Sequence, residues 1–418
     1  MSRKTKLALV PRLRFPLFRD AGGWTPCELG AFLEEYSERV PASTELPIYS
    51  STRTGLKLQK EYYDNRELAN DGEYGVVPEG LFVYRHMSDD GTFKFNINNT
   101  GRRIAVSKEY PVFSVVEMYP DFLLHLLNDG DEFKKFALAQ KKGGTRTRLY
   151  LSILRTSPVL LPSHGEQQRI ADCLSALDER IAAELIKLDT LNTHKEGLMQ
   201  QLFARNGEES APQLRFPAFR NKGRWRKRKL SDLLTKSVRP VNVDVNQMYQ
   251  EIGIRSHGRG VFHKDPVGGK ALGDKRVFWV EENAFVVNIV FAWEQAVAVT
   301  SAAEAGMIAS HRFPMYKPRD NQSDVNFIKY FFLTKKGKEL LGIASPGGAG
   351  RNKTLGQTEF ERLEFLSPES VAEQATIANA LSSLDDLITA QARKIELLKR
   401  HKKGMVQRLF AVQSEGAR

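Results

Sequence analysis

A long internal repeat dominates this sequence of 418 residues. Residues 166–204 align with residues 373–411 without a gap, and 19 of the 39 positions are identical. Unrelated segments of average composition would share about two or three identities over that length. We therefore interpret the chain as two copies of one unit rather than as a single compact fold.

Shorter matches extend the duplication toward the N-terminal side of each copy. LRFPLFRDAGGW at 13–24 matches LRFPAFRNKGRW at 214–225, and SKEYPVF at 107–113 matches SHRFPMY at 310–316. Between these anchors the copies diverge, and the remaining correspondences are Gly55 with Gly260 and LFVYR at 81–85 with FVVNI at 285–289. One scaffold with two different surfaces is the arrangement expected of a protein that recognises two different targets with the same architecture.

The repeated 39-residue segments are predicted to be helices with a coiled-coil seam, because apolar residues recur at alternating spacings of three and four. The seam positions are Ile170, Leu174, Leu177, Ile181, Leu188, Leu191, Leu198 and Leu202, then Ile377, Leu381, Leu384, Ile388, Ile395, Leu398, Met405 and Leu409. Polar residues interrupt both seams at matching places, which are Glu184 with Gln391 and Lys195 with Lys402. Such residues either fix the register of a helix pair or lie at an exposed edge of the seam.

The segments between the helices mix strand and helix signals. Short runs rich in Val, Ile, Phe and Tyr, bounded by Gly, Pro and Asn, predict strands within 75–85, 94–99, 102–107 and 277–293. PDFLLHLLND at 120–129 and residues 324–344 predict helices that open with an aspartate cap. We therefore expect an α+β fold, with domain boundaries at 1–163, 164–205, 206–370 and 371–418.

Composition and charge narrow the functional classes. Hydrophobic residues make up 41% of the chain and charged residues 27%, which excludes a mainly disordered protein. No run of 18 apolar residues and no secretory signal occurs, and Cys27 and Cys173 form no disulfide framework, so we expect a cytoplasmic protein without a membrane partner. The net charge of +12 favours a polyanion as partner.

The positive charge is unevenly distributed. Residues 225–372 contain 22 Lys and Arg against 16 Asp and Glu, whereas residues 25–165 contain 17 against 19. Local basic clusters nevertheless occur in both blocks and are the candidate DNA-binding residues; a solvated basic surface is the alternative. They are Arg53, Lys57, Lys60, Arg102, Arg103, Lys108, Lys141, Lys142, Arg146 and Arg148 in the first block, then Arg255, His257, Arg259, Lys264, Lys275, Arg276, Arg351, Asn352 and Lys353 in the second.

Two motifs resemble catalytic or cofactor sites. Asp121, Glu132 and Lys134 match the PD…(D/E)-x-K pattern of metal-dependent nucleases, but they fall in helical stretches and the second copy has no equivalent trio. GGAGRNKT at 347–354 resembles a phosphate-binding loop but lacks the glycine before its lysine. The histidines form no i, i+4 pair, so we expect no bound metal.

The chain has two variable domains, each followed by a repeated helix with the pattern EQ…IA..LS.LD..I…K…L..HK.G….LF. This arrangement resembles the specificity subunit of a type I restriction-modification system over essentially the whole chain. The resemblance implies two similar target recognition domains, separated by two long antiparallel coiled-coil helices with an internal two-fold repeat. Each domain of that family reads one half of a split, asymmetric target in double-stranded DNA.

The resemblance also implies partners. The helices of the family dock two methyltransferase (modification) subunits, and restriction/translocase subunits complete the assembly. The specificity subunit is non-catalytic, and S-adenosylmethionine, ATP and Mg²⁺ belong to the partner subunits. Two other hypotheses stay open from the residues alone: a stand-alone nuclease that uses Asp121, Glu132 and Lys134, and a coiled-coil scaffold without DNA binding.

Overall fold

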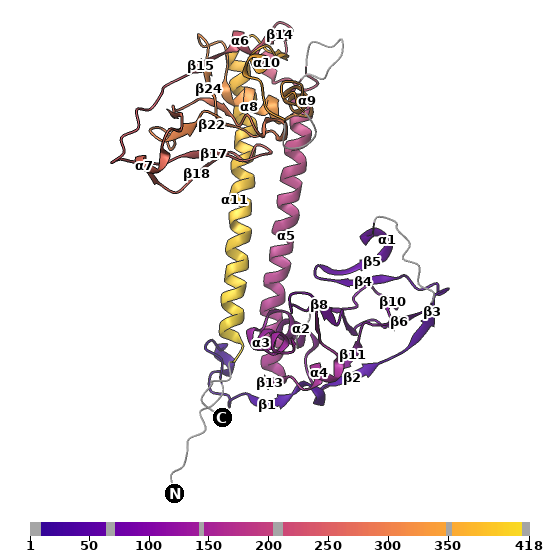
Figure 1. Ribbon diagram of the computed structural model, residues 1–418. Coiled ribbons are helices and arrows are strands. Elements are labelled where there is room, and N and C mark those ends of the chain that lie inside the picture. The colour runs from indigo at the N-terminus through magenta and orange to yellow at the C-terminus, as the bar shows by residue number, and fades with distance from the viewer. Residues whose placement is uncertain (1–9, 64–71, 142–145, 204–211, 348–352, 412–418) are drawn as a thin grey trace. The chain divides into compact units, whose positions relative to one another are not determined.

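The computed structural model describes residues 10–63, 72–141, 146–203, 212–347 and 353–411. The chain divides into two compact units: unit 1 comprises Met1–Leu185 with Arg393–Arg418, and unit 2 comprises Ile186–Ala392. Each unit contains one α+β domain and parts of two long helices, α5 and α11 (Figure 1). The predicted α+β class and internal repeat are confirmed.

The α+β part of unit 1, here called domain 1, is followed directly by α5. Its elements are η1 (Pro16–Phe18), β1 (Thr25–Glu28), η2 (Leu29–Ala31), β2 (Leu33–Tyr36), β3 (Arg39–Pro41), β4 (Tyr49–Thr52), β5 (Gly55–Leu58), α1 (Gln59–Tyr62), β6 (Glu73–Val77), β7 (Phe82–Tyr84), β8 (Met87–Ser88), β9 (Phe95–Ile97), β10 (Ile104–Ser107), β11 (Val112–Val115), α2 (Pro120–Asp129), α3 (Asp131–Ala139), β12 (Thr147–Arg148), α4 (Leu151–Arg155), β13 (Pro158–Leu161) and α5 (His164–Leu202).

The α+β part of unit 2, here called domain 2, is followed directly by α11. Its elements are η3 (Pro217–Phe219), β14 (Arg226–Lys229), α6 (Leu230–Leu233), β15 (Leu234–Ser237), β16 (Met248–Tyr249), β17 (Ile252–Ile254), β18 (Val261–His263), β19 (Val267–Gly268), α7 (Gly269–Leu272), β20 (Val277–Trp279), β21 (Phe285–Val287), η4 (Ala292–Glu294), β22 (Val297–Val299), β23 (Ile308–Ser310), β24 (Met315–Pro318), α8 (Val325–Leu333), α9 (Lys335–Ile343), α10 (Gln357–Glu361), β25 (Glu364–Ser367) and α11 (Val371–Leu409).

The two domains share one sheet topology. Domain 1 has a four-stranded antiparallel sheet in the order β2-β11-β7-β9, and domain 2 has β15-β24-β21-β22. Each domain also pairs its first strand with its last, β1 with β13 and β14 with β25. Divergent side chains therefore sit on the same backbone arrangement.

The strand register corrects one sequence alignment. Phe82 lies opposite Phe113 in domain 1, as Phe285 lies opposite Tyr316 in domain 2. Residues 81–85 therefore correspond to 284–288, and the predicted match with 285–289 is wrong by one position. A continuous apolar run has no alternation to reveal such a slip, whereas the pairing of strands fixes it.

Two helix predictions also need correction. Residues 324–344 form two helices, because α8 ends at Leu333 and Thr334 caps α9 by accepting the N–H of Gly337. Asp324 caps α8 as predicted, accepting from Phe327 at 2.8 Å. Asp121 caps nothing: it lies in the first turn of α2, whose N-cap residue makes no side-chain hydrogen bond.

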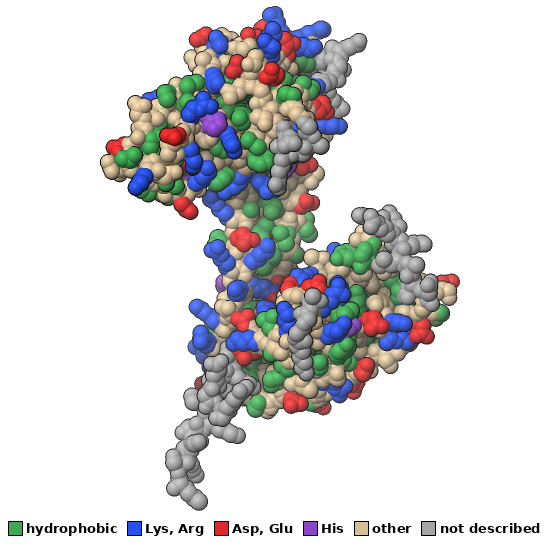
Figure 2. Space-filling model, in the orientation of Figure 1, with side chains coloured by type: hydrophobic (Ala, Val, Ile, Leu, Met, Phe, Trp, Pro, Cys, Tyr) green, Lys and Arg blue, Asp and Glu red, His purple; other side chains and the backbone are tan. Residues whose placement is uncertain are grey.

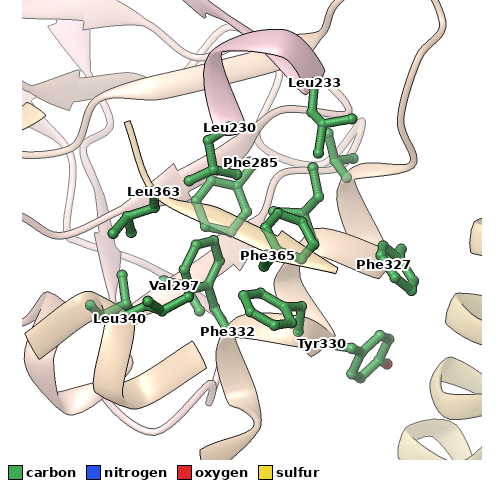
Figure 3. Packing of buried hydrophobic residues seen from close by; sticks show 14 of the residues in the cluster. Leu230, Leu233, Phe285, Val297, Phe327, Tyr330, Phe332, Leu340, Leu363 and Phe365 are labelled. Carbon is green, nitrogen blue, oxygen red and sulfur yellow. The ribbon is translucent and has the colours of Figure 1, made fainter. Parts of the chain in front are cut away.

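Aromatic side chains fill the core of each domain. Figure 3 shows Phe285, Phe332 and Phe365 packed beneath α6, the short helix that carries Leu230 and Leu233. The corresponding core of domain 1 contains Phe82, Phe95, Phe113 and Phe122. None of the described helices is long and apolar enough to cross a membrane.

The sixteen predicted seam residues of α5 and α11 are all buried or half-buried. Glu184 and Gln391 are buried as well, with 5% and 6% exposure, so they do not lie at an exposed edge. In unit 1, Lys394 forms an ion pair with Glu184 and Lys402 with Asp178, which places the two helices antiparallel.

Candidate nucleic-acid interface

A buried arginine–glutamate pair fixes each domain to the start of its long helix. Arg14 donates through Nε and Nη2 to both carboxylate oxygens of Glu166, at 2.8 and 2.7 Å. Arg215 makes the same bidentate contact with Glu373, at 2.7 and 2.7 Å. Both glutamates are 1% exposed. The repeated LRFP and EQ motifs are thus structural anchors rather than recognition residues.

The glutamine of each EQ motif makes a second anchor. Gln167 accepts the N–H of Tyr119 at 2.9 Å, and Gln374 accepts the N–H of Asp324 at 3.0 Å. Tyr119 and Asp324 are the N-cap positions of α2 and α8. The start of each long helix therefore holds the start of a helix in its own domain.

Reciprocal lysine–aspartate pairs join α5 to α11. Lys195 of α5 contacts Asp385 of α11 at 2.5 Å in unit 2, and Lys402 of α11 contacts Asp178 of α5 at 2.7 Å in unit 1. Tyr330 also donates to Asp385, at 2.7 Å. Because charged pairs at a helix seam are satisfied in only one register, these lysines fix how the helices align.

The Lys402 ammonium also fills the one cation-like site among the described residues. His125, Asp129 and Asp178 could together hold a metal ion by geometry. The Lys402 nitrogen lies 2.7 Å from both carboxylates, where a cation would sit. Burial alone would raise the pKa of Asp129, but hydrogen bonds from His125 and Lys402 lower it to about 2. The cluster is therefore an ion-pair network.

The basic residues predicted in domain 1 are exposed, and several have acidic partners. Arg53 contacts Asp90 at 2.7 Å, Arg146 contacts Asp89 at 3.0 Å, and Arg103 pairs with Glu38. The others that the structure describes are Lys57, Lys60, Arg102, Lys108, Lys141 and Arg148. Lys142 lies outside the described residues.

A polar hollow of 410 Å³ in domain 1 gathers cations that the sequence clusters did not include. Arg53 lines it together with Arg85 and Lys94. Burial lowers the pKa of Lys94. Arg85 and Lys94 are isolated in the sequence, so no local cluster indicated them. They meet because β7 and β9 are neighbours in the sheet.

The basic residues predicted in domain 2 are divided between exposed positions and internal contacts. The Arg255 guanidinium lies 4.8 Å from the ring centre of Phe262, and Lys264 contacts Glu251 at 3.4 Å. Lys353 lies 5.7 Å from a tryptophan ring. The exposed residues of this group are Arg255, His257, Arg259, Lys275 and Arg276, whereas Lys264 and Lys353 are half-buried. Arg351 and Asn352, with most of the glycine-rich loop at 347–354, fall outside the described residues.

A second hollow, of 190 Å³, lies in domain 2 between the β15–β24 pair and the turn after β23. Lys236, Arg276 and His311 line it. Only Arg276 was a candidate from the sequence. Lys236 and His311 are far apart along the chain, and strand pairing brings them to one place.

The nuclease-like residues do not form a catalytic arrangement. Asp121 lies on α2, whereas Glu132 and Lys134 lie on α3, and none of them is on a strand. Glu132 contacts Lys135 at 2.8 Å, and Lys134 donates to the carbonyl of Asp129 at 2.6 Å. Glu132 and Lys134 are thus engaged by neighbouring residues, and all three residues lie on helices, as the sequence pattern indicated.

Comparison with known proteins agrees with this architecture. Residues 58–192 match the family model described as the type I restriction modification DNA specificity domain. The type I restriction enzyme MjaX specificity subunit of Methanocaldococcus jannaschii is 22% identical over 303 residues, which cover 70% of this chain and 67% of that protein.

Two solved structures share the fold. The crystal structure of a type I restriction-modification system S subunit from M. genitalium has a TM-score of 0.58 and 12% identity, over 97% of this chain and all of that one. A chain from a structural study of complex assembly and conformational transition of the type I R-M system has a TM-score of 0.53 and 15% identity, over 93% and 98%. The likeness therefore extends through both domains and both long helices.

Proposed function

Because this chain resembles type I restriction-modification specificity subunits in sequence, repeat order and fold, we propose that it is the DNA-reading subunit of such an assembly. Each α+β domain reads one half of a bipartite, asymmetric target in double-stranded DNA. The chain itself is non-catalytic in this proposal. S-adenosylmethionine, ATP and Mg²⁺ act in the modification and restriction/translocase subunits.

The observation that carries this proposal is the contrast between the anchors and the surfaces of the two copies. Both copies keep the arginine–glutamate anchor, the glutamine anchor and the lysine–aspartate pair. The exposed charges of the two domains differ. A duplicated frame with unlike surfaces suits the reading of two unlike half-sites.

In this proposal the long helices set the distance between the half-sites and dock two modification subunits. Each helix has 39 residues and spans roughly 58 Å at about 1.5 Å per residue. Large aliphatic side chains are exposed on them: Ile186 is 69% exposed, Leu387 55% and Leu397 64%. In this proposal they are candidate contacts for the modification subunits.

A domain exchange tests the proposal. Residues 226–345 are replaced by the matching block of another specificity subunit, and the methylated motif is mapped by sequencing the DNA of a host that expresses the hybrid with its modification subunit. We expect one half of the motif to change and the other to persist. If both halves changed together, the model of two separate readers would be wrong.

A further inference from the structure

Equivalent positions around one hollow carry opposite charge in the two domains. In domain 2 the hollow is lined by Lys236, Arg276 and His311. The matching hollow of domain 1 has a volume of 370 Å³. Its charged lining residues are the glutamates Glu35, Glu38 and Glu109 and the cations Arg39 and Lys108. The two hollows lie at the same place in the shared topology, so their difference is one of side chains only.

Strand register establishes the equivalence at the first position. Glu35 of β2 lies opposite Phe113 of β11, and Lys236 of β15 lies opposite Tyr316 of β24. Phe113 and Tyr316 are the matching last residues of the repeated SKEYPVF and SHRFPMY segments. Glu35 of domain 1 therefore occupies the position that corresponds to Lys236 of domain 2.

The turn between the next two strands is equivalent as well. Tyr110 N–H donates to the carbonyl of Ser107 at 3.0 Å, as Phe313 N–H does to Ser310 at 2.9 Å. Glu109 thus corresponds to Arg312. Ser107 lies opposite Tyr74 and Ser310 opposite Val277, so the residues just before these partners, Glu73 and Arg276, also correspond.

Four glutamates of domain 1 are consequently replaced by cations in domain 2. The pairs are Glu35 with Lys236, Glu38 with Arg239, Glu73 with Arg276 and Glu109 with Arg312. The two cations that line the hollow of domain 1, Arg39 and Lys108, correspond to Pro240 and His311.

Several of the domain 2 cations are available to an anion. Arg239 contacts Glu281 at 3.4 Å and Lys236 donates to Gln357, but among the residues that the structure describes Arg276 and Arg312 form no ion pair. The backbone N–H of His311 donates to the backbone carbonyl of Arg276 at 3.1 Å, so the two side chains start from neighbouring positions on paired backbone segments. Figure 2 shows several exposed Lys and Arg side chains on the displayed face of unit 2.

From this arrangement we propose that the hollow of domain 2 binds phosphodiester groups of the DNA backbone through two of its lining residues, Lys236 and Arg276, and through the exposed Arg312, which follows the lining residue His311 in the chain. We propose further that domain 1 makes no such contact at the equivalent place. The inference rests on the proposed function. Cations that converge on a concave surface bind phosphate, whereas carboxylates repel it. A backbone contact carries no sequence information, so this site supplies affinity and orientation rather than base recognition.

The experiment uses the full-length chain co-purified with its modification subunit, and measures binding to duplexes with and without the mapped motif over a range of salt concentrations. The variant Lys236→Gln/Arg276→Gln/Arg312→Gln is compared with the matched control Glu35→Gln/Glu73→Gln/Glu109→Gln. Melting temperatures of both variants should equal that of the wild type, because the substituted side chains lie at the surface.

We expect the slope of log K against log salt to become shallower by about 1–2 in the domain 2 variant, since each phosphate contact contributes about 0.9. One such contact corresponds to about a tenfold change in K between 0.1 M and 1 M salt. The loss should be equal on both duplexes. The domain 1 control should bind as tightly as the wild type or more tightly.

Three results would overturn the inference while leaving the proposed function intact: an unchanged slope, a loss confined to the duplex with the motif, or an equal loss in the domain 1 control. A saturable complex with ATP in the absence of DNA, lost in the domain 2 variant, would assign the hollow to a free nucleotide instead. Failure of the wild-type assembly to bind DNA would contradict the proposed function itself.

Discussion

The two buried glutamate anchors should differ in strength, and the difference can be worked out from their contacts. Removing the carboxylate of Glu373 leaves Arg215, whose side chain is 13% exposed, without its bidentate partner. Breaking a buried ion pair in this way costs about 3–5 kcal/mol. Glu373 also accepts the indole N–H of Trp225 at 3.2 Å, and a buried donor left without a partner costs about 1–3 kcal/mol more.

Among the residues that the structure describes, the glutamate anchor of the first copy has no corresponding hydrogen bond from a tryptophan. The indole nitrogen of Trp24 is buried and, within the described part of the chain, has no hydrogen-bond partner. Glu166→Ala should therefore cost only the loss of the Arg14 pair. We expect Glu373→Ala to destabilise unit 2 by about 1–3 kcal/mol more than Glu166→Ala destabilises unit 1.

A pair of double-mutant cycles measures this difference. Glu373→Ala is combined with Trp225→Phe, and Glu166→Ala with Trp24→Phe, and unfolding of the full chain is followed in urea with hydrogen exchange resolving the two units. The first cycle should give a coupling of about 1 kcal/mol or more and the second a coupling near zero. Equal couplings in both copies would refute the reasoning from the tryptophan contact.

Three further predictions follow from other contacts. Because the pKa of Asp129 is lowered in the folded chain, its ionised carboxylate stabilises unit 1 above about pH 4, and this stabilisation is lost as the pH falls toward 2. Lys402→Met should therefore reduce the loss of unfolding free energy between pH 5 and pH 2 by about 1–2 kcal/mol in urea titrations. The control Lys403→Met, at an exposed neighbouring position, should leave that loss unchanged. Asp121→Ala with Glu132→Ala should leave modification and cleavage by the assembly intact; loss of cleavage with retained DNA binding would revive the nuclease hypothesis. Insertion of four residues after Ala183 and after Ala390 lengthens the helices by about 6 Å, close to two base pairs at 3.4 Å per step, so the methylated motif should keep both half-sites and gain one or two unspecified bases between them. An active insertion variant with an unchanged gap would show that the helices do not measure the distance.

The long helices could be predicted from the sequence because their determinants are local and repeated. Spacings of three and four at Ile170, Leu174 and Leu177 indicate the buried face of a helix directly. The break at Thr334 was missed, because residues 324–344 are apolar at helical spacing across it. The local signal for the start of α9 is the hydroxyl of Thr334, which caps the helix, and this signal is weaker than the apolar pattern that continues across it.

The candidate interface was predicted less completely, because cations that act together are often distant in the sequence. Arg276 lies beside a second basic residue and was recognised, whereas Lys236 has no basic neighbour. His311 precedes Arg312, but this pair was recognised only as part of the repeated segment 310–316. The proximity of Lys236, Arg276 and His311 depends on which strands pair and in which register. The opposite charges of Glu35 and Lys236 can be compared only through the strand register, which aligns the two domains residue by residue.

The reciprocal pairs of Lys195 with Asp385 and Lys402 with Asp178 have a combinatorial consequence. Each half of the chain contributes one lysine and one aspartate to the pairing of the two helices, and the attached domains add one contact each, from Asp129 to Lys402 and from Tyr330 to Asp385. Two halves that keep these few residues retain the contacts that align the helices, although the other side chains on the surfaces of their domains differ. If each domain reads one half-site, as proposed, a set of n such halves would yield on the order of n² ordered combinations, and new specificities would arise by reassortment without any change in the helices.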